Sequence, residues 1–347
     1  MSTNLFDMTH TLRNLGDLIA YLPYELGFVA TDSLVAVGLS RDRVTVVARM
    51  DLDDDFAFAD CADTTADAFG RAGIDEAICC VLLDPGMPAR PAATRADHLR
   101  RRFARRGVRV RHVLMSTEGT WWAQRCSCGA CPTRPTRVPG PERVDAVLAS
   151  VVEGMAPCAS RADLARSLRQ TRADLARRVA AHVPAARALP AQELVAVLWQ
   201  IMHGSQEIAR IPAAMLAAVS VSLRNSRTRD EVFSWVTPAL PMPSSTAHPV
   251  HRARQLRLVD AAAGAAPRLS TAQTRDRMIE WLQCLPDPLR PPVLTLIAGS
   301  AWSAGSGALA SIAVEQALQI DPGYRLALLV GRACGSGLRP HLLAESR

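Results

Sequence analysis

The sequence contains no lysine, so all 40 of its basic residues are arginines. A chain without lysine cannot carry a Walker phosphate-binding loop, and neither a G-x-S-x-G nor an H-E-x-x-H motif occurs in it. These absences exclude P-loop nucleotide hydrolases, esterases built on a nucleophile elbow, and zincin-type metalloproteases. The sequence holds no complete catalytic constellation of these familiar kinds.

Long apolar segments are also missing, because no run approaches the length needed to cross a membrane. The first twenty residues carry Asp7, His10, Arg13 and Asp17 where a signal peptide would have a continuous apolar stretch. The nine cysteines are an odd number and are mostly scattered, which favours free thiols in a reducing compartment over a disulfide framework. We therefore expect a cytoplasmic protein with no membrane partner.

Aromatic residues make up only 5% of the chain, although 49% of it is apolar, so core volume must come from Leu, Val and Ala. The 347 residues are enough for two domains. Residues 1–140 hold 17 Arg and 17 acids, whereas residues 141–347 hold 23 Arg and 16 acids, which is the whole net charge of +7. A basic second half suits an acidic partner or nucleic acid, although a mild excess is also typical of a solvated surface.

Alternating strand and helix patterns fill the first half and predict a mixed α/β sheet domain that ends near residue 138. The N-terminal helix is stopped or bent by Pro23 and closed by Gly27. Strands are predicted at 34–39, 44–50, 77–83, 108–115 and around Trp121 and Trp122, with helices at 60–71 and 94–106 between them. Thr94 is the expected N-cap of the last of these helices.

Carboxylates follow two of the predicted strands. Asp51 and Asp53 come after the first hairpin, and Asp84 follows the next strand. Ligands in such sheets tend to lie beyond the carboxyl ends of parallel strands, and carboxylate oxygens are suitable ligands for Mg²⁺. Asp is also a common turn residue. The pattern leaves open a metal-dependent enzyme that uses these three carboxylates.

From residue 139 to the end the patterns are helical, with a possible break in the proline-rich segment 237–250. Ser160 and Asp163 resemble a capping box and predict one long helix that includes 161–178. The polar face of this helix carries Arg161, Arg166, Arg169, Arg172, Arg177 and Arg178. Such a face could follow a phosphate backbone, but Asp163 and Asp174 favour an ordinary exposed face.

A second basic feature, formed by Arg224, Asn225 and Arg227, precedes a helix predicted over 231–236. Two arginines near a helix N-terminus could bind an anion, because the backbone N–H groups there point outward. Asp230 lies close in the sequence, so an internal ion pair is equally plausible. The segment is a candidate binding site with these two interpretations open.

The last part of the chain predicts a helical hairpin over 294–302 and 307–320. Ala310, Ala317 and Pro322 fall at the spacing of the small residues and terminal proline in a tetratricopeptide repeat. The match covers one repeat at most. Small residues at these positions would allow two antiparallel helices to approach closely.

A cluster of three cysteines, Cys126, Cys128 and Cys131, lies between the two halves. Three thiolates could bind Zn²⁺, with Cys158 or His112 as the fourth ligand. A closed zinc site would stabilise the junction between the halves, since such sites contribute directly to folding. Redox-active thiols are an alternative, because flanking arginines lower the pKa of a thiol. The third interpretation is a loop braced by Pro and Gly in which the cysteines are incidental.

Four segments in order resemble a known family. They are Tyr21–Phe28 with Asp32–Val35, Trp121–Trp122 followed by Cys131-Pro132, Leu223–Asp230, and Ala301–Tyr324. Over nearly the whole chain they resemble the actinobacterial domain of unknown function 4192 family, which implies no activity because none is assigned. Its members usually carry two cysteines at the spacing of Cys126 and Cys131, often with a third beside the second. Here Pro132 takes that third place and Cys128 is additional, which argues against a family-wide C-x-C-x-x-C metal site.

The whole sequence predicts an α+β protein, with a mixed sheet domain over 1–138 and an all-helical domain over 139–347 that ends in a tetratricopeptide-like hairpin. We expect a non-catalytic interaction or regulatory protein whose helical half binds a protein partner. The alternatives are an Mg- or Zn-dependent enzyme with a site at the strand ends, and a nucleic-acid-binding protein that uses the 161–178 arginines. The expected binding residues are Trp121, Trp122, Arg224, Asn225 and Arg227.

Overall fold

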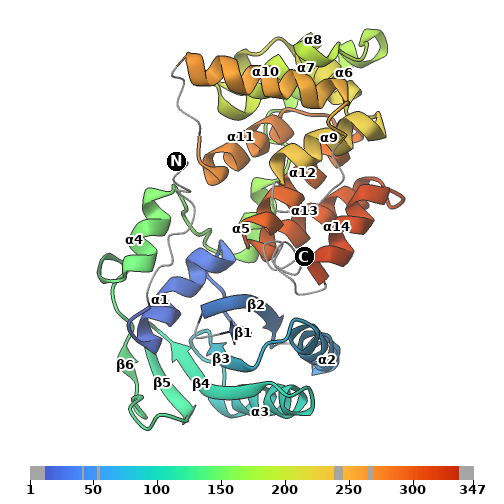
Figure 1. Cartoon of the computed structure of the whole chain (residues 1–347). Coiled ribbons are helices and arrows are strands. Elements are labelled where there is room, and N and C mark those ends of the chain that lie inside the picture. Colours follow the sequence, from blue (N-terminus) through green and yellow to red (C-terminus); the bar gives the residue numbers. More distant parts are fainter. Residues whose placement is uncertain (1–11, 41–42, 53–54, 238–244, 265–268, 336–347) are drawn as a thin grey trace. The chain divides into compact units, whose positions relative to one another are not determined.

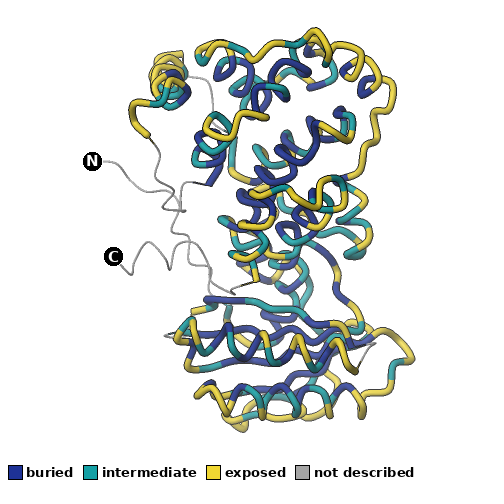
Figure 2. The backbone as a smooth tube through the Cα atoms, turned by 90° about the vertical axis from the view of Figure 1, so that its right-hand side faces the viewer, coloured by how far each residue is buried: buried dark blue, intermediate teal, exposed yellow. Residues whose placement is uncertain are grey.

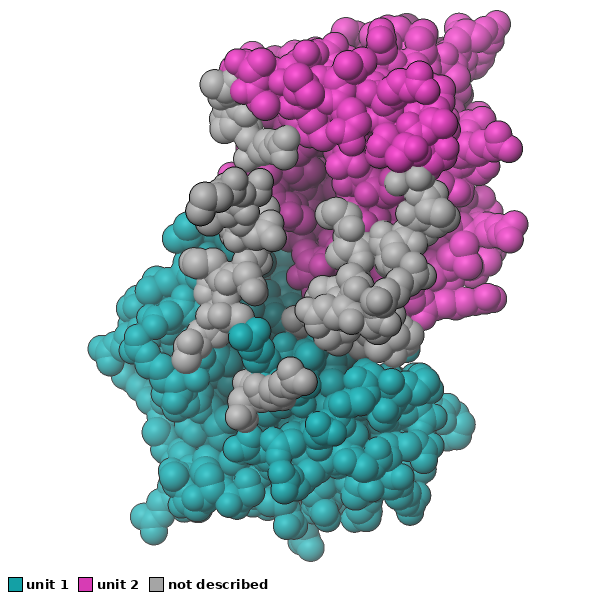
Figure 3. Space-filling model, viewed as in Figure 1, with its two compact units in different colours: residues 1–161, 335–338 teal, residues 162–334, 339–347 magenta. Residues whose placement is uncertain are grey.

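The computed structural model describes residues 12–40, 43–52, 55–237, 245–264 and 269–335. These residues form two compact units, one reaching up to Arg161 and the other running from Ala162 to Cys334 (Figure 3). The first unit contains the sheet, and the second is helical wherever it is described, which confirms the expected α+β class (Figure 1). Residues 139–161, which the sequence pattern places in the helical domain, lie in the unit that holds the sheet.

A six-stranded mixed sheet forms the frame of the first unit. Its strands are β1 (Ser33–Ser40), β2 (Arg43–Asp51), β3 (Glu76–Leu82), β4 (Arg109–Thr117), β5 (Thr120–Cys126) and β6 (Thr136–Arg137). They lie in the order β2-β1-β3-β4-β5-β6, with β3 and β4 parallel and every other neighbouring pair antiparallel. The predicted succession of strands and helices, including the β1–β2 hairpin, is confirmed, and β6 adds a short edge strand.

Helices cover the sheet of the first unit. They are α1 (Leu15–Leu26), α2 (Asp55–Arg71), α3 (Ala89–Arg105) and the short α4 (Asp145–Val152), which packs against α1. Helices α2 and α3 share a buried core with the strands, in which the rings of Phe69 and Phe103 stack 4.8 Å apart. The strands of the first unit are largely buried (Figure 2), and the middle of β3, from Ala77 to Val81, is buried throughout, as its continuous apolar run predicts.

Two helices of this unit differ from their expected ends. Pro23 does not stop α1, which continues to Leu26 and ends where Gly27 takes the left-handed conformation (φ 80°). Helix α3 begins at Ala89, so Thr94 is not its N-cap; the Thr94 hydroxyl donates instead to the carbonyl of Arg90. The reason is that Pro91 falls in the first turn, where its missing N–H would have no partner within the helix.

Ten helices are described from Arg161 onward. They are α5 (Arg161–Ser167), α6 (Ala173–His182), α7 (Ala191–His203), α8 (Ala213–Ser222), α9 (Ser226–Val236), α10 (Pro249–Ala263), α11 (Thr271–Gln283), α12 (Arg290–Ser303), α13 (Gly307–Ile320) and α14 (Arg325–Gly335). Helix α12 is central, because every residue from Arg290 to Trp302 is buried, and it packs against α9, α11 and α13. A Cβ atom at Gly299 would lie 2.4 Å from the ring of Phe233, so this glycine permits the close approach of α9.

The predicted helical hairpin near the end of the chain is confirmed as α12 and α13. The two helices are joined by Ala304–Ser306 and make the most extensive helix–helix contact in the described chain. Ala310 and Ala317 are fully buried, and small side chains at these positions allow the close packing. Residues 238–244, half of the proline-rich segment 237–250, lie outside the described residues, and α10 begins at Pro249.

The single long helix expected over 161–178 is wrong, because α5 ends at Ser167 and α6 starts at Ala173. The residues between them bond to distant segments instead of continuing a helix. Leu168 O accepts from the Arg290 guanidinium, and Gln170 Nε2 donates to Leu285 O. The arginines of this stretch therefore do not share one continuous helix face. Two of them pair with acids on their own helices, as Arg166–Asp163 and Arg177–Asp174.

No helix in the described part of the chain is both long and apolar enough to cross a membrane. The longest helices, α2 and α3, each carry several charged residues along their outer faces. This pattern is expected because only one side of each helix packs against the sheet.

Candidate metal centre

The β4–β5 hairpin places a histidine opposite a cysteine. Its strands are joined by Glu118 and Gly119, which both have positive φ (48° and 70°), as in a type I′ turn. Further along, the register shifts by one residue, and Gln124 is the extra residue in β5. Such a bulge re-aims the side chains that follow it. As a result, His112 of β4 pairs with Cys126, the last residue of β5.

The segment after β5 folds back along that strand. The N–H of Ser127 donates to Arg111 O at 3.1 Å, and the N–H of Ala123 donates to Pro132 O at 2.7 Å. Between these two bonds Gly129 takes a left-handed conformation (φ 72°), which few other residues adopt without strain. The loop that carries the two later cysteines is thereby fixed beside the end of β5.

Four ligand atoms converge at this end of the sheet. The Sγ atoms of Cys126, Cys128 and Cys131 and a ring nitrogen of His112 all lie within 4.8 Å of one another. Three of the separations are 3.1 Å from Cys126 to Cys128, 3.6 Å from Cys128 to Cys131, and 3.9 Å from Cys131 to His112 Nδ1. Tetrahedral zinc with Zn–S of about 2.3 Å and Zn–N of about 2.0 Å needs neighbouring ligand atoms roughly 3.4–3.8 Å apart. We call these four residues the Cys/His cluster, and its spacing fits one zinc ion.

The Cys/His cluster is closed on the sheet side and open on one flank. His112 is buried with 5% of its surface exposed, Cys126 and Cys131 are half-buried, and Cys128 is exposed. Within the described ranges no other three His, Cys, Asp or Glu residues converge in this way. A solvent-facing ligand beside a buried one is an arrangement that leaves a path for a metal ion to enter.

Hydrogen bonds within the Cys/His cluster separate the pKa values of its thiols. Burial alone would raise the pKa of Cys126, but hydrogen bonds from Cys128 and Cys131 outweigh it and lower the pKa to about 5. Burial and the bonds that it donates raise the pKa of Cys131 to about 12. Without a cation the cluster therefore concentrates its first negative charge on Cys126, and Cys131 keeps its proton to stabilise it.

The fourth group of the Cys/His cluster is His112, and Cys158 lies elsewhere in the first unit. Cys158 forms an isolated bridge with Phe28, where its N–H donates to Gly27 O and its carbonyl accepts from Val29 N–H, both at 2.9 Å. The sequence left these two candidates open because a register shift in one strand decides between them. That shift has no clear signal in the order of residues.

The two tryptophans of β5 lie on opposite faces of the sheet. Trp121 is buried with 6% of its surface exposed, and its indole nitrogen faces Gly16, where a Cβ atom would lie 2.9 Å away. Trp122 is half-buried and packs against the core under α2 and α3. Both side chains hold β5 against its neighbours, so their large apolar surfaces serve packing.

The carboxylates at the strand ends build turns. Asp51 pairs with Arg49 of its own strand, Asp84 is exposed, and Asp53 lies outside the described residues. Asp32 organises this edge: it takes a left-handed conformation (φ 45°), and its carboxylate accepts from the N–H of Asp84 at 2.9 Å. Its carbonyl also accepts from Leu52 N–H, so it connects the ends of β1, β2 and β3. Neither Asp51 nor Asp84 belongs to a convergent group of metal-ligating residues in the described chain.

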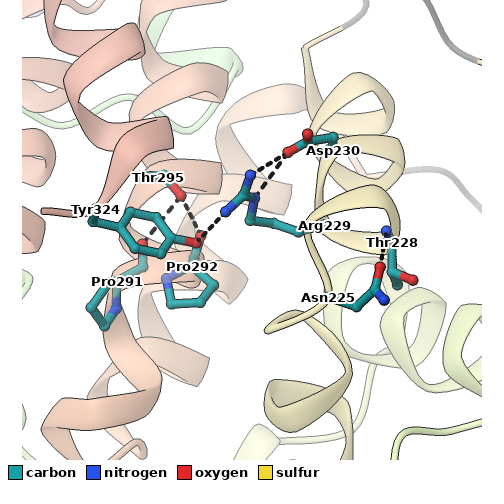
Figure 4. Close-up of polar contacts among 8 residues, drawn as sticks. All are labelled: Asn225, Thr228, Arg229, Asp230, Pro291, Pro292, Thr295 and Tyr324. Atoms are coloured by element: carbon teal, nitrogen blue, oxygen red, sulfur yellow. Dashed lines mark hydrogen bonds and ion pairs between the residues drawn. The ribbon is translucent and has the colours of Figure 1, made fainter. Parts of the chain in front are cut away.

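Asn225 begins α9, because its side-chain oxygen accepts from the N–H of Thr228 at 3.1 Å (Figure 4). Arg224 and Arg227 beside it are exposed. The ion pair of Asp230 is made with Arg229 and not with either of these two arginines. The sequence left open an anion-binding site and an internal ion pair. The internal ion pair exists, but Arg229 forms it in place of Arg224 or Arg227.

Arg229 connects α9 to the start of α14. Its Nε and Nη2 atoms donate to Asp230 Oδ1, its Nη1 donates to the Tyr324 hydroxyl at 3.3 Å, and its guanidinium lies 5.4 Å from the centre of the Tyr324 ring (Figure 4). Burial would lower the pKa of Arg229, but Asp230 and Tyr324 outweigh it and raise the pKa. Burial raises the pKa of Tyr324. We call Arg229, Asp230 and Tyr324 the arginine contact.

Sequence reasoning did not identify Asp32, Arg229 or Tyr324 as a key residue. Each lies inside one of the four segments that carry the family resemblance, and the arginine contact joins two of those segments, 223–230 and 301–324, in space. The sequence signal for these three residues was the presence of unusual polar side chains in segments that lie far apart in the chain. Their partners become visible only once the helices are packed.

Comparisons with known proteins identify one family and no characterised relative. Residues 16–341 match a family described as "Domain of unknown function (DUF4192)". No curated protein matches the chain, and no solved structure does. The chain's own chemistry is therefore the source of any functional conclusion.

Proposed function

Because the chain belongs to the DUF4192 family, whose description names no activity, we propose a function from its residues: the first unit binds one structural Zn²⁺ through the Cys/His cluster. The observation that carries this proposal is the convergence of three thiols and an imidazole within 4.8 Å. Four groups of this kind rarely meet by chance at one end of a sheet, because the weak hydrogen bonds that thiols make with one another gain little compared with coordination of a cation.

The donor set favours zinc over other divalent ions. Thiolates and imidazole suit Zn²⁺, whereas Mg²⁺ and Ca²⁺ take oxygen ligands, and the cluster contains none. Three thiolates and one neutral imidazole carry a charge of −3, which a dication reduces to −1. The dication would thereby stabilise the deprotonated form of its ligands, and all three thiols would bind as thiolates.

The coordination number favours a structural role for the metal. Four protein ligands fill a tetrahedral zinc shell, while catalytic zinc sites keep one position for water or substrate. The ligands come from β4, from the end of β5 and from the loop that folds back along β5. A metal there would fasten the loop to the hairpin, and the protein would act without catalysis at this site.

Metal analysis of the purified full-length protein tests this proposal. We expect one zinc per chain, a loss of zinc in the Cys131→Ser and His112→Gln variants, and full retention in Cys61→Ser, which changes an exposed cysteine of α2 outside the cluster. Protein purified without added chelator that holds no zinc, or a Cys131→Ser variant that keeps it, would contradict the proposal.

A second proposal concerns the helical unit, which we infer binds an acidic amphipathic segment of a partner protein. The observation that favours it is the outer face of α10. Leu256 and Val259, one turn apart, are 54% and 68% exposed, and Arg252 and Arg257 beside them are exposed as well. Apolar residues flanked by arginines suit a partner helix that carries Leu or Val among Asp and Glu.

This second proposal can be tested in cells that express the full-length protein. A photoreactive residue at position 259 should cross-link to a segment rich in acidic and apolar residues, and the same residue at exposed Gln273 on α11 should not. The double change Arg252→Glu/Arg257→Glu should abolish the cross-link. A cross-link that survives charge reversal, or a cross-linked segment without acids, would overturn the proposal.

A further inference from the structure

The Cys/His cluster presents one thiol to solvent with a second thiol beside it. Cys128 is exposed, and its Sγ lies 3.6 Å from that of Cys131. A disulfide needs about 2.05 Å between the sulfur atoms, so a shift of roughly 1.5 Å would join them. By contrast, Cys79 and Cys80 are fully buried in β3, where no oxidant can reach them. The solvent-accessible thiols of the first unit are thus those of the Cys/His cluster, Cys61 and the half-buried Cys158.

We propose that Cys128 and Cys131 form a modification site: a hydroperoxide oxidises them to a disulfide and thereby expels the zinc ion. The inference rests on the zinc site proposed above and adds a reaction to it. It makes the metal centre a regulated structural element, intact under reducing conditions and dismantled under oxidising ones.

The backbone selects this pair among the three thiols. Cys128 and Cys131 are separated by Gly129 and Ala130, and the left-handed Gly129 already bends the chain so that the two ends of the C-x-x-C segment face each other. Cys126 is held differently, because it is paired with His112 in the β4–β5 ladder. A disulfide between Cys126 and Cys128 would have to close across Ser127, whose N–H is bonded to β4. That closure would break the end of the ladder.

The reaction balances in two steps. The Cys128 thiolate attacks one oxygen of the hydroperoxide, an S–O bond forms, the O–O bond breaks, and the leaving alkoxide or hydroxide takes a proton from water. The Cys131 thiolate then attacks the sulfur of this sulfenic acid, the S–S bond forms, and hydroxide leaves and takes a second proton. In sum, two thiolates, one hydroperoxide and two protons give a disulfide, one alcohol or water from the peroxide, and one water.

Zinc leaves because the oxidised cluster retains only His112 and Cys126 as ligands. A disulfide sulfur is a poor ligand, and two remaining donors hold zinc far more weakly than four. A dithiol reductant reverses the change by thiol–disulfide exchange, after which the four ligands are available again. The loop after β5 would then be fastened or released according to the redox state.

The experiment treats the zinc-loaded full-length protein with hydrogen peroxide and follows the release of zinc with a chromogenic chelator. We expect one zinc to be released per chain, and residue-resolved alkylation to find Cys126 free while Cys128 and Cys131 are protected until a dithiol is added. The Cys61→Ser variant should release zinc at an unchanged rate. Cys128→His, which keeps a zinc ligand but removes the exposed thiol, should slow the release by about tenfold or more.

The outcomes separate this inference from the zinc proposal. A protein that holds no zinc before treatment would overturn both. Zinc that is present but stays bound under peroxide, or that leaves with a disulfide involving Cys126, would overturn the modification site alone. An unchanged rate of release in Cys128→His would do the same, because it would show that the exposed thiol is not the group attacked.

Discussion

The Cys/His cluster of the first unit and the arginine contact of the second fasten distant segments in opposite ways. The arginine contact contains a cation, a carboxylate and an aromatic ring, so its charges are balanced by the chain itself. The Cys/His cluster contains three thiols and an imidazole, and no cation from the chain lies among these four groups. The arginine contact is complete within the chain, whereas the Cys/His cluster, on the zinc proposal, requires an ion from outside it.

This difference indicates which part of the protein can be regulated. A contact closed by its own charges does not depend on metal supply or on the redox state of a thiol. A contact that depends on an ion responds to metal supply and to the redox state of its ligands. On the zinc and oxidation proposals, metal supply and redox state therefore change the stability of the first unit and leave that of the helical unit unchanged. Changes made in one unit at a time distinguish the two responses.

Removal of zinc should produce the largest effect and should be confined to the first unit. A ligand present at a thousand times its Kd adds about 4 kcal/mol to the free energy of unfolding, and a chelator would remove that contribution. Hydrogen exchange should become faster in β5 and in residues 127–137, with α9 and α12 unchanged. Equal acceleration in both units would show that the metal does not act where the ligands lie.

The change Gly299→Ala should destabilise the helical unit by about 2 kcal/mol, because overpacking of a close-packed core costs that much. The new methyl group would lie 2.4 Å from the Phe233 ring and 2.6 Å from the Thr237 methyl. Chemical unfolding measures the loss, and zinc content should not change. Gly307→Ala is the matched control: no atom lies within 4 Å of its added methyl, so this variant should be as stable as the parent.

The change Tyr324→Phe should lower the free energy of unfolding of the helical unit by about 1 kcal/mol, the usual contribution of one hydrogen bond. The variant loses the bond from Arg229 Nη1 but keeps the ring under the guanidinium. In an Arg229→Met background the same change should cost less, since its partner is already gone. Equal costs in the two backgrounds would show that the two residues are not coupled.

The change Arg177→Gln should have the smallest effect, with no measurable change in the free energy of unfolding. Arg177 pairs with Asp174 three residues away, and their side chains are 79% and 87% exposed, so solvent screens the pair. Chemical unfolding at low and high salt measures it. A clear loss of stability at low salt would mean that α6 depends on its charged face, contrary to the packing of its Leu175 and Val179 side.

Local patterns predicted most of the fold. The continuous apolar run of β3, the alternation in β4 and the small residues of α13 each identify an element without help from the rest of the chain. Sequence patterns did not predict the structure correctly where residues far away in the chain form hydrogen bonds that interrupt a helix. Leu168 and Gln170 have helical neighbours on both sides, yet their bonds to Arg290 and Leu285 interrupt the helix, and no property of residues 161–178 shows this.

The candidate site was predicted in part for the same reason. Three of its four ligands are adjacent in sequence and visible as a cluster, whereas the fourth comes from β4. The choice between His112 and Cys158 requires strand register, which depends on turn geometry and on one extra residue. The arginine contact was missed altogether, because Arg229 and Tyr324 are brought together only by the packing of α9 against α12 and its neighbours.

The bulge at Gln124 has a consequence for how the ligand set is specified. With the same sequence and no bulge, the ladder would place Gln124 opposite Val113 and Arg125 opposite His112, and Cys126 would turn to the other face of the sheet. Such a one-residue slip would keep every cysteine and the histidine and still lose the site, with a cation in the place of a ligand, whereas a variant that lacks Gln124 would pair Cys126 with His112 in a regular ladder. The proposed metal centre thus depends on strand register as much as on the identity of its ligands.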